Sequence, residues 1–108
     1  MKKILQDDEH PTAVFTGNDL MALGVYEAIF DEGLKIPDDV SVFGHDDIEL
    51  ASLIRPGLTT MRQPKYRIGK LAAEELLGII NENKDPNLTE VVLKTELIER
   101  ESVKSLLD

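Results

Sequence analysis

The sequence predicts an α/β fold, a partial doubly wound parallel sheet with flanking helices. The first observation is that short apolar runs typical of strands alternate with longer segments of helical apolar spacing, as in right-handed β-α-β units. The second is that glycine and polar residues follow the apolar runs, where strands end in turns. A length of 108 residues suits one small domain, so we expect a single domain over residues 1–108.

Two strands are expected in the first half of the chain. Residues 12–15 form an apolar run before a Thr-Gly turn and predict a buried strand. Residues 40–43 are apolar except for Ser41, which suits a buried parallel strand, and residues 44–47 are expected to form the turn after it. Residues 2–8, ahead of the first strand, are typical of the end of a helix.

A helix is expected between these strands, over residues 19–32. Asn18 or Gly17 stands at its N-cap, and Gly33 stands at the position after its end, where a left-handed backbone is common. Pro37 stiffens the following loop.

The second half continues the alternation. Residues 49–54 predict a short helical turn, and residues 58–62 predict a third strand. Residues 66–81 form the longest helix, with apolar residues near one face. Residues 90–93 and 96–100 are each interpreted as a closing strand.

The helix over residues 19–32 is apolar on more than one side, since residues 20–26 carry no charged side chain. A sheet covers only one side of a helix, so a second cover is needed. The residues expected against the sheet are Met21, Val25, Ala28 and Ile29. Those expected on the other side are Leu23, Tyr26 and Phe30. Our hypothesis is a homodimer, and the alternative is coverage by other parts of the chain.

Polar residues at the ends of the first two strands are the candidate binding residues. Asn18 offers a donor and an acceptor to adjacent sugar hydroxyls, and it is also a good helix cap. Asp46 and Asp47 can each accept two hydrogen bonds from hydroxyls, or can cap the short helix. His45 can contact a ligand, although one backbone contact is the simpler role. Ligands of open α/β sheets bind at this edge.

Composition and motifs argue against several functions. The net charge of −9 is unlike a nucleic-acid-binding surface. The chain has no cysteine, no long apolar span and no signal-peptide pattern, so we expect a cytoplasmic protein away from membranes. Adjacent residues 45–47 diverge, so no metal site is expected. Neither a nucleophile elbow nor a nucleotide-binding glycine motif occurs, so we expect neither an enzyme nor a cofactor.

Three stretches resemble the effector-binding region of the LacI/GalR family of bacterial transcription regulators. They are PTAVFTGNDLMALG at 11–24, IPDDVSVFGHDD at 36–47 and PGLTTMRQP at 56–64, and the similarity runs from about residue 4 to 103. The resemblance implies a periplasmic-binding-protein-like type I fold and a small-molecule effector, for which a sugar such as ribose is our expectation. Operator DNA would be bound only through a helix-turn-helix headpiece, which is not in this sequence.

The resemblance also implies roles for particular residues. In the family, the Asn of Asn-Asp-x-Met-Ala, here Asn18, contacts the effector, as does the first Asp after glycine and an aromatic residue, here Asp46. His45 departs from the usual Tyr or Phe. Arg62 or Gln63 reaches the cleft or packs in the hinge. The residues expected at the dimer interface are Leu23, Tyr26, Phe30, Leu53 and Ile54.

Within the family pattern, residues 12–62 correspond to the core of the second lobe, 63–90 to a helical segment that returns to the first lobe, and 90–103 to closing strands. The helix stripe Ile68, Leu71, Ala72, Leu76 and Ile79 then needs a cover. We expect it to fold back on this sheet, to swap between subunits, or to belong to a longer native chain.

The leading hypothesis is therefore effector recognition and dimerisation within a transcription regulator. A purely structural dimerisation fragment is the alternative. A phosphoacceptor signalling domain, with residues 46 and 47 as its acidic pair, is a weaker third hypothesis, because no lysine or further aspartate stands where that chemistry needs it.

Overall fold

The computed structural model describes residues 1–85 and 90–107. These residues form two compact units. The first unit is Met1–Arg62 with Glu96–Asp108, and the second is Gln63–Thr95. The boundary after Arg62 is the point at which the sequence predicted the start of the helical segment.

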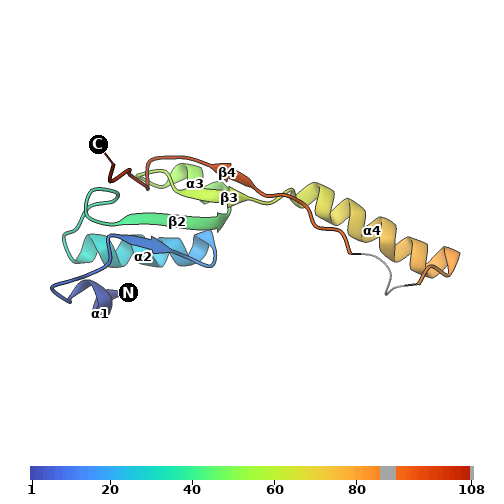
Figure 1. Cartoon of the computed structure of the whole chain (residues 1–108), viewed down its shortest axis with the longest axis horizontal. Coiled ribbons are helices and arrows are strands. Elements are labelled where there is room, and N and C mark those ends of the chain that lie inside the picture. Colours follow the sequence, from blue (N-terminus) through green and yellow to red (C-terminus); the bar gives the residue numbers. More distant parts are fainter. Residues whose placement is uncertain (86–89, 108) are drawn as a thin grey trace. The chain divides into compact units, whose positions relative to one another are not determined.

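A four-stranded sheet forms the centre of the first unit (Figure 1). Its strands are β1 (Ala13–Phe15), β2 (Ser41–Asp46), β3 (Thr59–Arg62) and β4 (Glu96–Ile98), in that spatial order. β1, β2 and β3 are parallel, which confirms the predicted α/β class, and β4 runs antiparallel to β3. The predicted parallel sheet thus carries one antiparallel strand at its edge.

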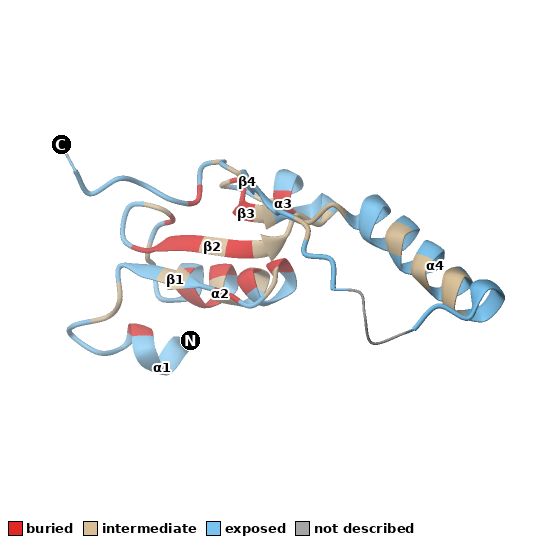
Figure 2. Ribbon diagram, turned by 45° about the vertical axis from the view of Figure 1, so that its right-hand side comes forward, coloured by how far each residue is buried: buried red, intermediate tan, exposed pale blue. Residues whose placement is uncertain are grey.

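Three helices belong to this unit: α1 (Lys2–Leu5), α2 (Asp19–Asp31) and α3 (Glu49–Leu53). The long helix α2 packs on one face of the sheet, and the buried residues concentrate on β2 and on the side of α2 toward it (Figure 2). The core comprises residues from α2, the strands and the connecting loops, among them Ala22, Tyr26, Ile29, Val40, Val42 and Leu58.

The expected orientation of α2 is wrong for two residues. Met21 is 60% exposed, whereas Tyr26 is 4% exposed and donates a hydrogen bond of 2.9 Å to the Pro56 carbonyl oxygen. The reason is the helical period, because Ala22, Tyr26 and Ile29 form the stripe on the inner face. Burial raises the pKa of the Tyr26 hydroxyl to about 12.

Two strand predictions are also corrected. β1 is an edge strand rather than a buried one, and Phe15 is 67% exposed while it stacks on Phe43 at 5.3 Å between ring centroids. β2 extends through residues 44–46, which were expected to form a turn, because pairing with β3 continues to Asp46 opposite Arg62.

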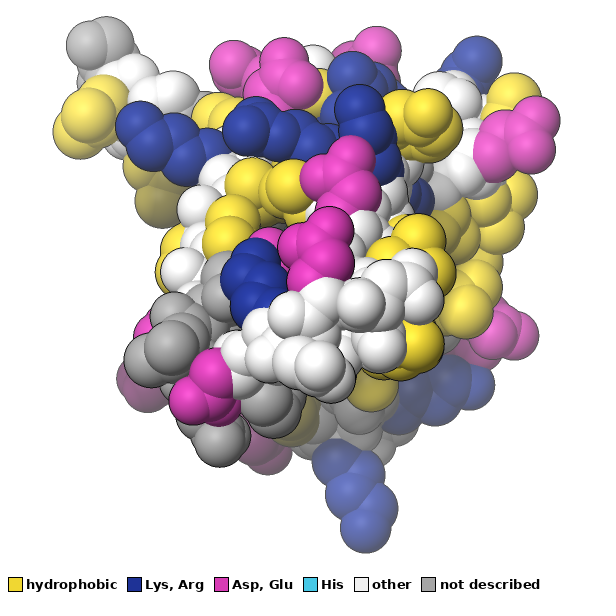
Figure 3. All heavy atoms as spheres, turned by 90° about the vertical axis from the view of Figure 1, so that its right-hand side faces the viewer, with side chains coloured by type: hydrophobic (Ala, Val, Ile, Leu, Met, Phe, Trp, Pro, Cys, Tyr) yellow, Lys and Arg dark blue, Asp and Glu magenta, His cyan; other side chains and the backbone are white. Residues whose placement is uncertain are grey.

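The second unit consists of α4 (Lys65–Glu82) and residues 83–95, of which 86–89 lie outside the description. Residues 90–93 form no strand, contrary to expectation, since they lack a strand partner in the described sheet. Residues 91–93 line an open groove of about 470 Å³ together with Pro64, Ile68 and Leu71. No described residue of α4 is buried, and Leu76 is 57% exposed, so its apolar stripe is only partly covered. The space-filling view shows such hydrophobic side chains between charged ones (Figure 3).

None of the helices in the described ranges has the length and apolar character needed to cross a membrane.

Candidate functional site

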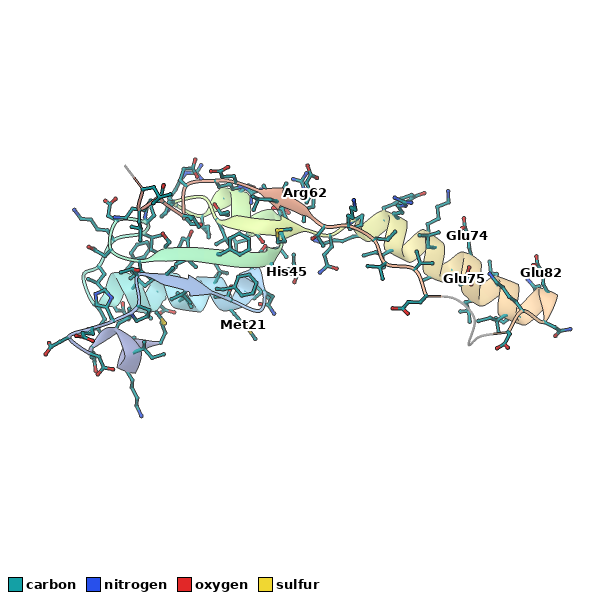
Figure 4. All side chains as sticks on the ribbon, viewed as in Figure 1. Met21, His45, Arg62, Glu74, Glu75 and Glu82 are labelled. Atoms are coloured by element: carbon teal, nitrogen blue, oxygen red, sulfur yellow. The ribbon has the colours of Figure 1, made fainter. Side chains whose placement is uncertain are left out.

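The candidate site lies where the three parallel strands end. β1, β2 and β3 are neighbours, so the turn after β1, the end of β2 and the end of β3 share one edge of the sheet. Figure 4 shows His45 and Arg62 at this end, together with Met21 from the start of α2. This carboxyl-end edge brings together four of the five predicted binding residues: Asn18, His45, Asp46 and Arg62.

Asn18 is the N-cap of α2, and its side-chain oxygen accepts a hydrogen bond of 2.9 Å from the Met21 amide. The capping role predicted for it is confirmed. Thr16 holds the same turn, because its hydroxyl lies 2.9 Å from the Asn18 carbonyl oxygen and 3.1 Å from that of Phe43. Asn18 is half-buried, and the cap uses its amide oxygen, so the amide NH₂ is a separate donor at the same position.

Asp46 and His45 end β2 with partly exposed side chains, at 34% and 31% exposure. The Nδ1 atom of His45 lies 3.2 Å from Oδ1 of Asp46. Asp46 has a φ of 115° and Asp47 a φ of 52°, a pair of left-handed conformations that residues other than glycine seldom adopt. Such backbone strain persists only where the surroundings impose it, and it is concentrated at functional sites.

Asp47 is not the helix cap that was one alternative, because Ile48 occupies that position. Its 7% exposed carboxylate instead accepts hydrogen bonds from Arg62 Nε at 2.7 Å and Arg100 Nη2 at 2.8 Å. Burial by itself would raise the pKa of the Asp47 carboxyl, but the bonds from Arg62 and Arg100 outweigh it and lower the pKa. Asp47 therefore has a structural role at the carboxyl-end edge, as a charged carboxylate paired with two arginines.

The side chain of Arg62 forms an ion pair with Asp47 and is itself 50% exposed. Glu96 lies 4.0 Å from it. Gln63, the fifth predicted binding residue, belongs to the second unit and lines the groove there.

The sequence places Asp19 beside Asn18 at the candidate binding turn, but it does not predict the buried contacts of Asp19. Its carboxylate is 1% exposed and accepts a hydrogen bond of 2.7 Å from the Thr60 hydroxyl and one of 2.9 Å from the Ile48 amide. It also lies so close to Gly44 that a β-carbon there would overlap it. Gly44 was the available signal, because a glycine inside a strand marks a close approach.

The residues predicted for a dimer interface differ in their exposure. Phe30 and Leu53 are 48% and 62% exposed, and Leu23 is half-buried. Ile54 is half-buried against the core, and Tyr26 is covered within the chain. The clearly exposed apolar residues of this set are therefore Phe30 on α2 and Leu53 on α3.

Across residues 1–85 and 90–107, no group of three His, Cys, Asp or Glu side chains is arranged to hold a metal ion.

The sequence matches the family described as the periplasmic binding protein-like domain over residues 1–103. The chain belongs to this family, and it is part of an effector-binding domain of the LacI/GalR type. The resemblance noted from the sequence motifs is thus confirmed.

Two curated relatives are repressors. The chain is 46% identical over 104 residues to the HTH-type transcriptional repressor PurR of Vibrio atlanticus, covering 96% of this chain and 31% of that protein. It is 45% identical over 106 residues to the ribose operon repressor of Haemophilus influenzae, covering 98% and 32%. The chain spans about a third of the length of these relatives.

Solved structures show the same fold. A LacI family regulator from Enterococcus faecium with bound ribose has a TM-score of 0.79 and 34% identity, covering 89% of this chain and 35% of that one. A Lac repressor dimer bound to operator and an anti-inducer has a TM-score of 0.85 and 32% identity, covering 96% and 36%.

Proposed function

We propose that this chain forms one wall of a sugar-binding cleft in a LacI-type transcription regulator of the cytoplasm. Its carboxyl-end edge would recognise a small polyol such as ribose without making or breaking a covalent bond. In the parent regulator, effector binding at this edge would be coupled to operator binding elsewhere, through a headpiece.

The observation that carries the proposal is the strained end of β2. Asp46 holds a partly exposed carboxylate at the carboxyl-end edge with a φ of 115°. Asn18 lies beyond the neighbouring strand β1 and supplies an amide. A carboxylate that accepts from two hydroxyls and an amide that donates and accepts are suited to a sugar.

The relatives support the class of ligand. The Haemophilus relative is a ribose operon repressor, and the Enterococcus structure holds ribose. Ribose is therefore the first sugar to test on this chain, with a hexose and a purine as comparison ligands.

Titration calorimetry of the 108-residue chain with D-ribose tests the proposal. We expect weak binding that Asp46→Asn reduces about tenfold, which corresponds to about 1.4 kcal/mol, the scale of a lost charged hydrogen bond. Glu49→Gln is the matched control, since it removes a carboxylate from the first turn of α3. Absence of heat with every ligand would favour a purely structural dimerisation role. Equal loss in both variants would contradict a specific contact from Asp46.

We also propose that the chain forms a homodimer through the exposed apolar surface of α2 and α3. Phe30 and Leu53 are its central residues, with Leu23 at its side. Apolar side chains grouped on one surface of a small protein mark interaction sites. The related Lac repressor structure is a dimer, which agrees with this proposal.

A further inference from the structure

Asp19 connects three segments that are distant in sequence. It is the first residue of α2, directly after Asn18. Its Oδ2 atom accepts from the amide of Ile48, just beyond β2, and its Oδ1 atom accepts from the hydroxyl of Thr60 on β3. At 1% exposure, this carboxylate has no solvent to replace a lost partner, so both bonds constrain the structure strongly.

The bond to Ile48 acts on the strained segment. Asp46, the last residue of β2, and Asp47 directly precede Ile48, and both have positive φ. An L-residue in these conformations relaxes to an ordinary one unless its surroundings hold it. Asp19 holds the far end of this segment at the Ile48 amide, while pairing of Asp46 with Arg62 holds the near end.

Gly44 makes this arrangement possible. A β-carbon at residue 44 would overlap Oδ1 of Asp19 and come within 2.9 Å of a Leu58 methyl group. The glycine thus leaves the space into which the Asp19 carboxylate fits, beside the end of β2. The carboxylate also lies at the N-terminus of α2, where the helix dipole favours a negative charge.

We infer that Asp19 is a positioning residue of the carboxyl-end edge, which fixes the backbone of residues 46–48 and thereby the direction of the Asp46 carboxylate. It does not touch the ligand itself. The inference rests on the proposed sugar-binding function, but its effect on the backbone can be measured without a ligand.

Three variants of the full chain separate positioning from general stability. Asp19→Ala removes both bonds. Thr60→Val removes only the bond from β3 and is the matched control. Asp19→Asn keeps an oxygen for the Ile48 amide, and its NH₂ can donate to the Thr60 hydroxyl, so it should act as a rescue variant.

Nuclear magnetic resonance supplies the readout. The scalar couplings between HN and Hα depend on φ, so they report the conformation of Asp46 and Asp47 in the folded chain. We expect Asp19→Ala to change these couplings toward values of negative φ, while Thr60→Val and Asp19→Asn keep them. A merely structural role would lower stability in Asp19→Ala and Thr60→Val alike and leave the couplings unchanged, and that result would overturn the inference.

Titration of the same samples with D-ribose tests the link to function. We expect the dissociation constant of Asp19→Ala to rise about tenfold, and that of Thr60→Val to stay within about twofold, which is about 0.4 kcal/mol. Changed couplings with unchanged ribose affinity would overturn the link to the ligand. If the wild-type chain binds no ribose, the proposed function fails, and the couplings alone decide the role of Asp19 in the backbone.

One further measurement, on the wild-type chain, tests the inference even if the Asp19→Ala variant does not fold. In the wild-type chain, a scalar coupling across the hydrogen bond should connect the Ile48 amide nitrogen with the Asp19 carboxyl carbon. Detection supports the bond on which the inference depends, and its absence under conditions that reveal backbone hydrogen bonds would overturn it.

Discussion

The Asp19 carboxylate occupies the space that a side chain at Gly44 would need. The two residues are 25 positions apart in sequence, and together they join the start of α2 to the interior of β2. This contact packs the start of α2 against β2 near its carboxyl end.

Gly44→Ala should therefore destabilise the fold by about 2 kcal/mol, because the new methyl group forces the Asp19 carboxylate or the strand to move. Gly24→Ala is the matched control in the same unit, since a β-carbon there meets no atom within 4 Å. It should stabilise α2 by about 0.5–1 kcal/mol, as alanine favours a helix. Urea unfolding measures both. Equal stability of the two variants would contradict the close packing at Gly44.

Asp47→Asn should weaken the unit by about 1–2 kcal/mol near neutral pH, since the bonds to Arg62 and Arg100 are charged but Arg62 is half exposed and screened. The folded-state pKa of Asp47 is lowered, so its stabilisation is present above the unfolded value of about 3.9 and is lost as the pH falls through the lower folded value.

Urea unfolding at a series of pH values checks this dependence. The difference between wild type and Asp47→Asn should shrink as the solution is acidified below about pH 4. Asp31→Asn is the control, because its ion pair with Lys2 is on the surface. A difference that does not change with pH would argue against a charged role for Asp47.

The Tyr26 hydroxyl should lose its proton only at high pH. Burial raises the pKa of Tyr26 to about 12 in the folded chain, above its value of about 10 in the unfolded chain. The contribution of the protonated Tyr26 hydroxyl to folding stability is therefore present below about pH 10 and is lost as the pH rises from 10 towards 12. The chain has two tyrosines, and in Tyr66→Phe the absorbance of phenolate reports Tyr26 alone. Ionisation at pH 10 in the folded protein would contradict its burial against Pro56.

Phe30→Glu and Leu53→Glu should each convert a dimer into monomers, because a charge in an apolar interface costs several kcal/mol. Sedimentation equilibrium measures the mass, which should fall by half. Ile4→Glu, at an apolar residue with 50% exposure on α1, should leave the dimer intact. A wild-type chain that stays monomeric at all concentrations would exclude this interface.

Local sequence signals predicted the parts of the fold that depend on neighbours in the chain. The cap at Asn18 and the left-handed Gly33, with a φ of 73°, are examples. The contacts that sequence reasoning missed join distant residues. In the sequence, Asp47 has the features of a helix cap. Only the folded structure shows that it binds Arg100, 53 positions away. Tyr26 was assigned to the outer face because periodicity does not reveal which stripe faces the sheet.

The residues proposed for the candidate site come from the sequence, whereas the contacts that hold them in place come from the structure. Asn18 and Asp46 stand at neighbouring strand ends, as the alternation of elements implied. The positive φ of Asp46 follows from pairing of β2 with β3 and from the bond of Asp19 to Ile48, and neither has a local signal.

An amide chemical-shift map of the 108-residue chain, titrated with D-ribose, shows whether the sugar binds at the carboxyl-end edge. We expect saturable shifts confined to the turn at residues 16–19, to residues 44–48 and to Arg62, with the surface of α4 unaffected. Shifts elsewhere, or none at sugar concentrations that saturate a weak site, would contradict the proposed binding site.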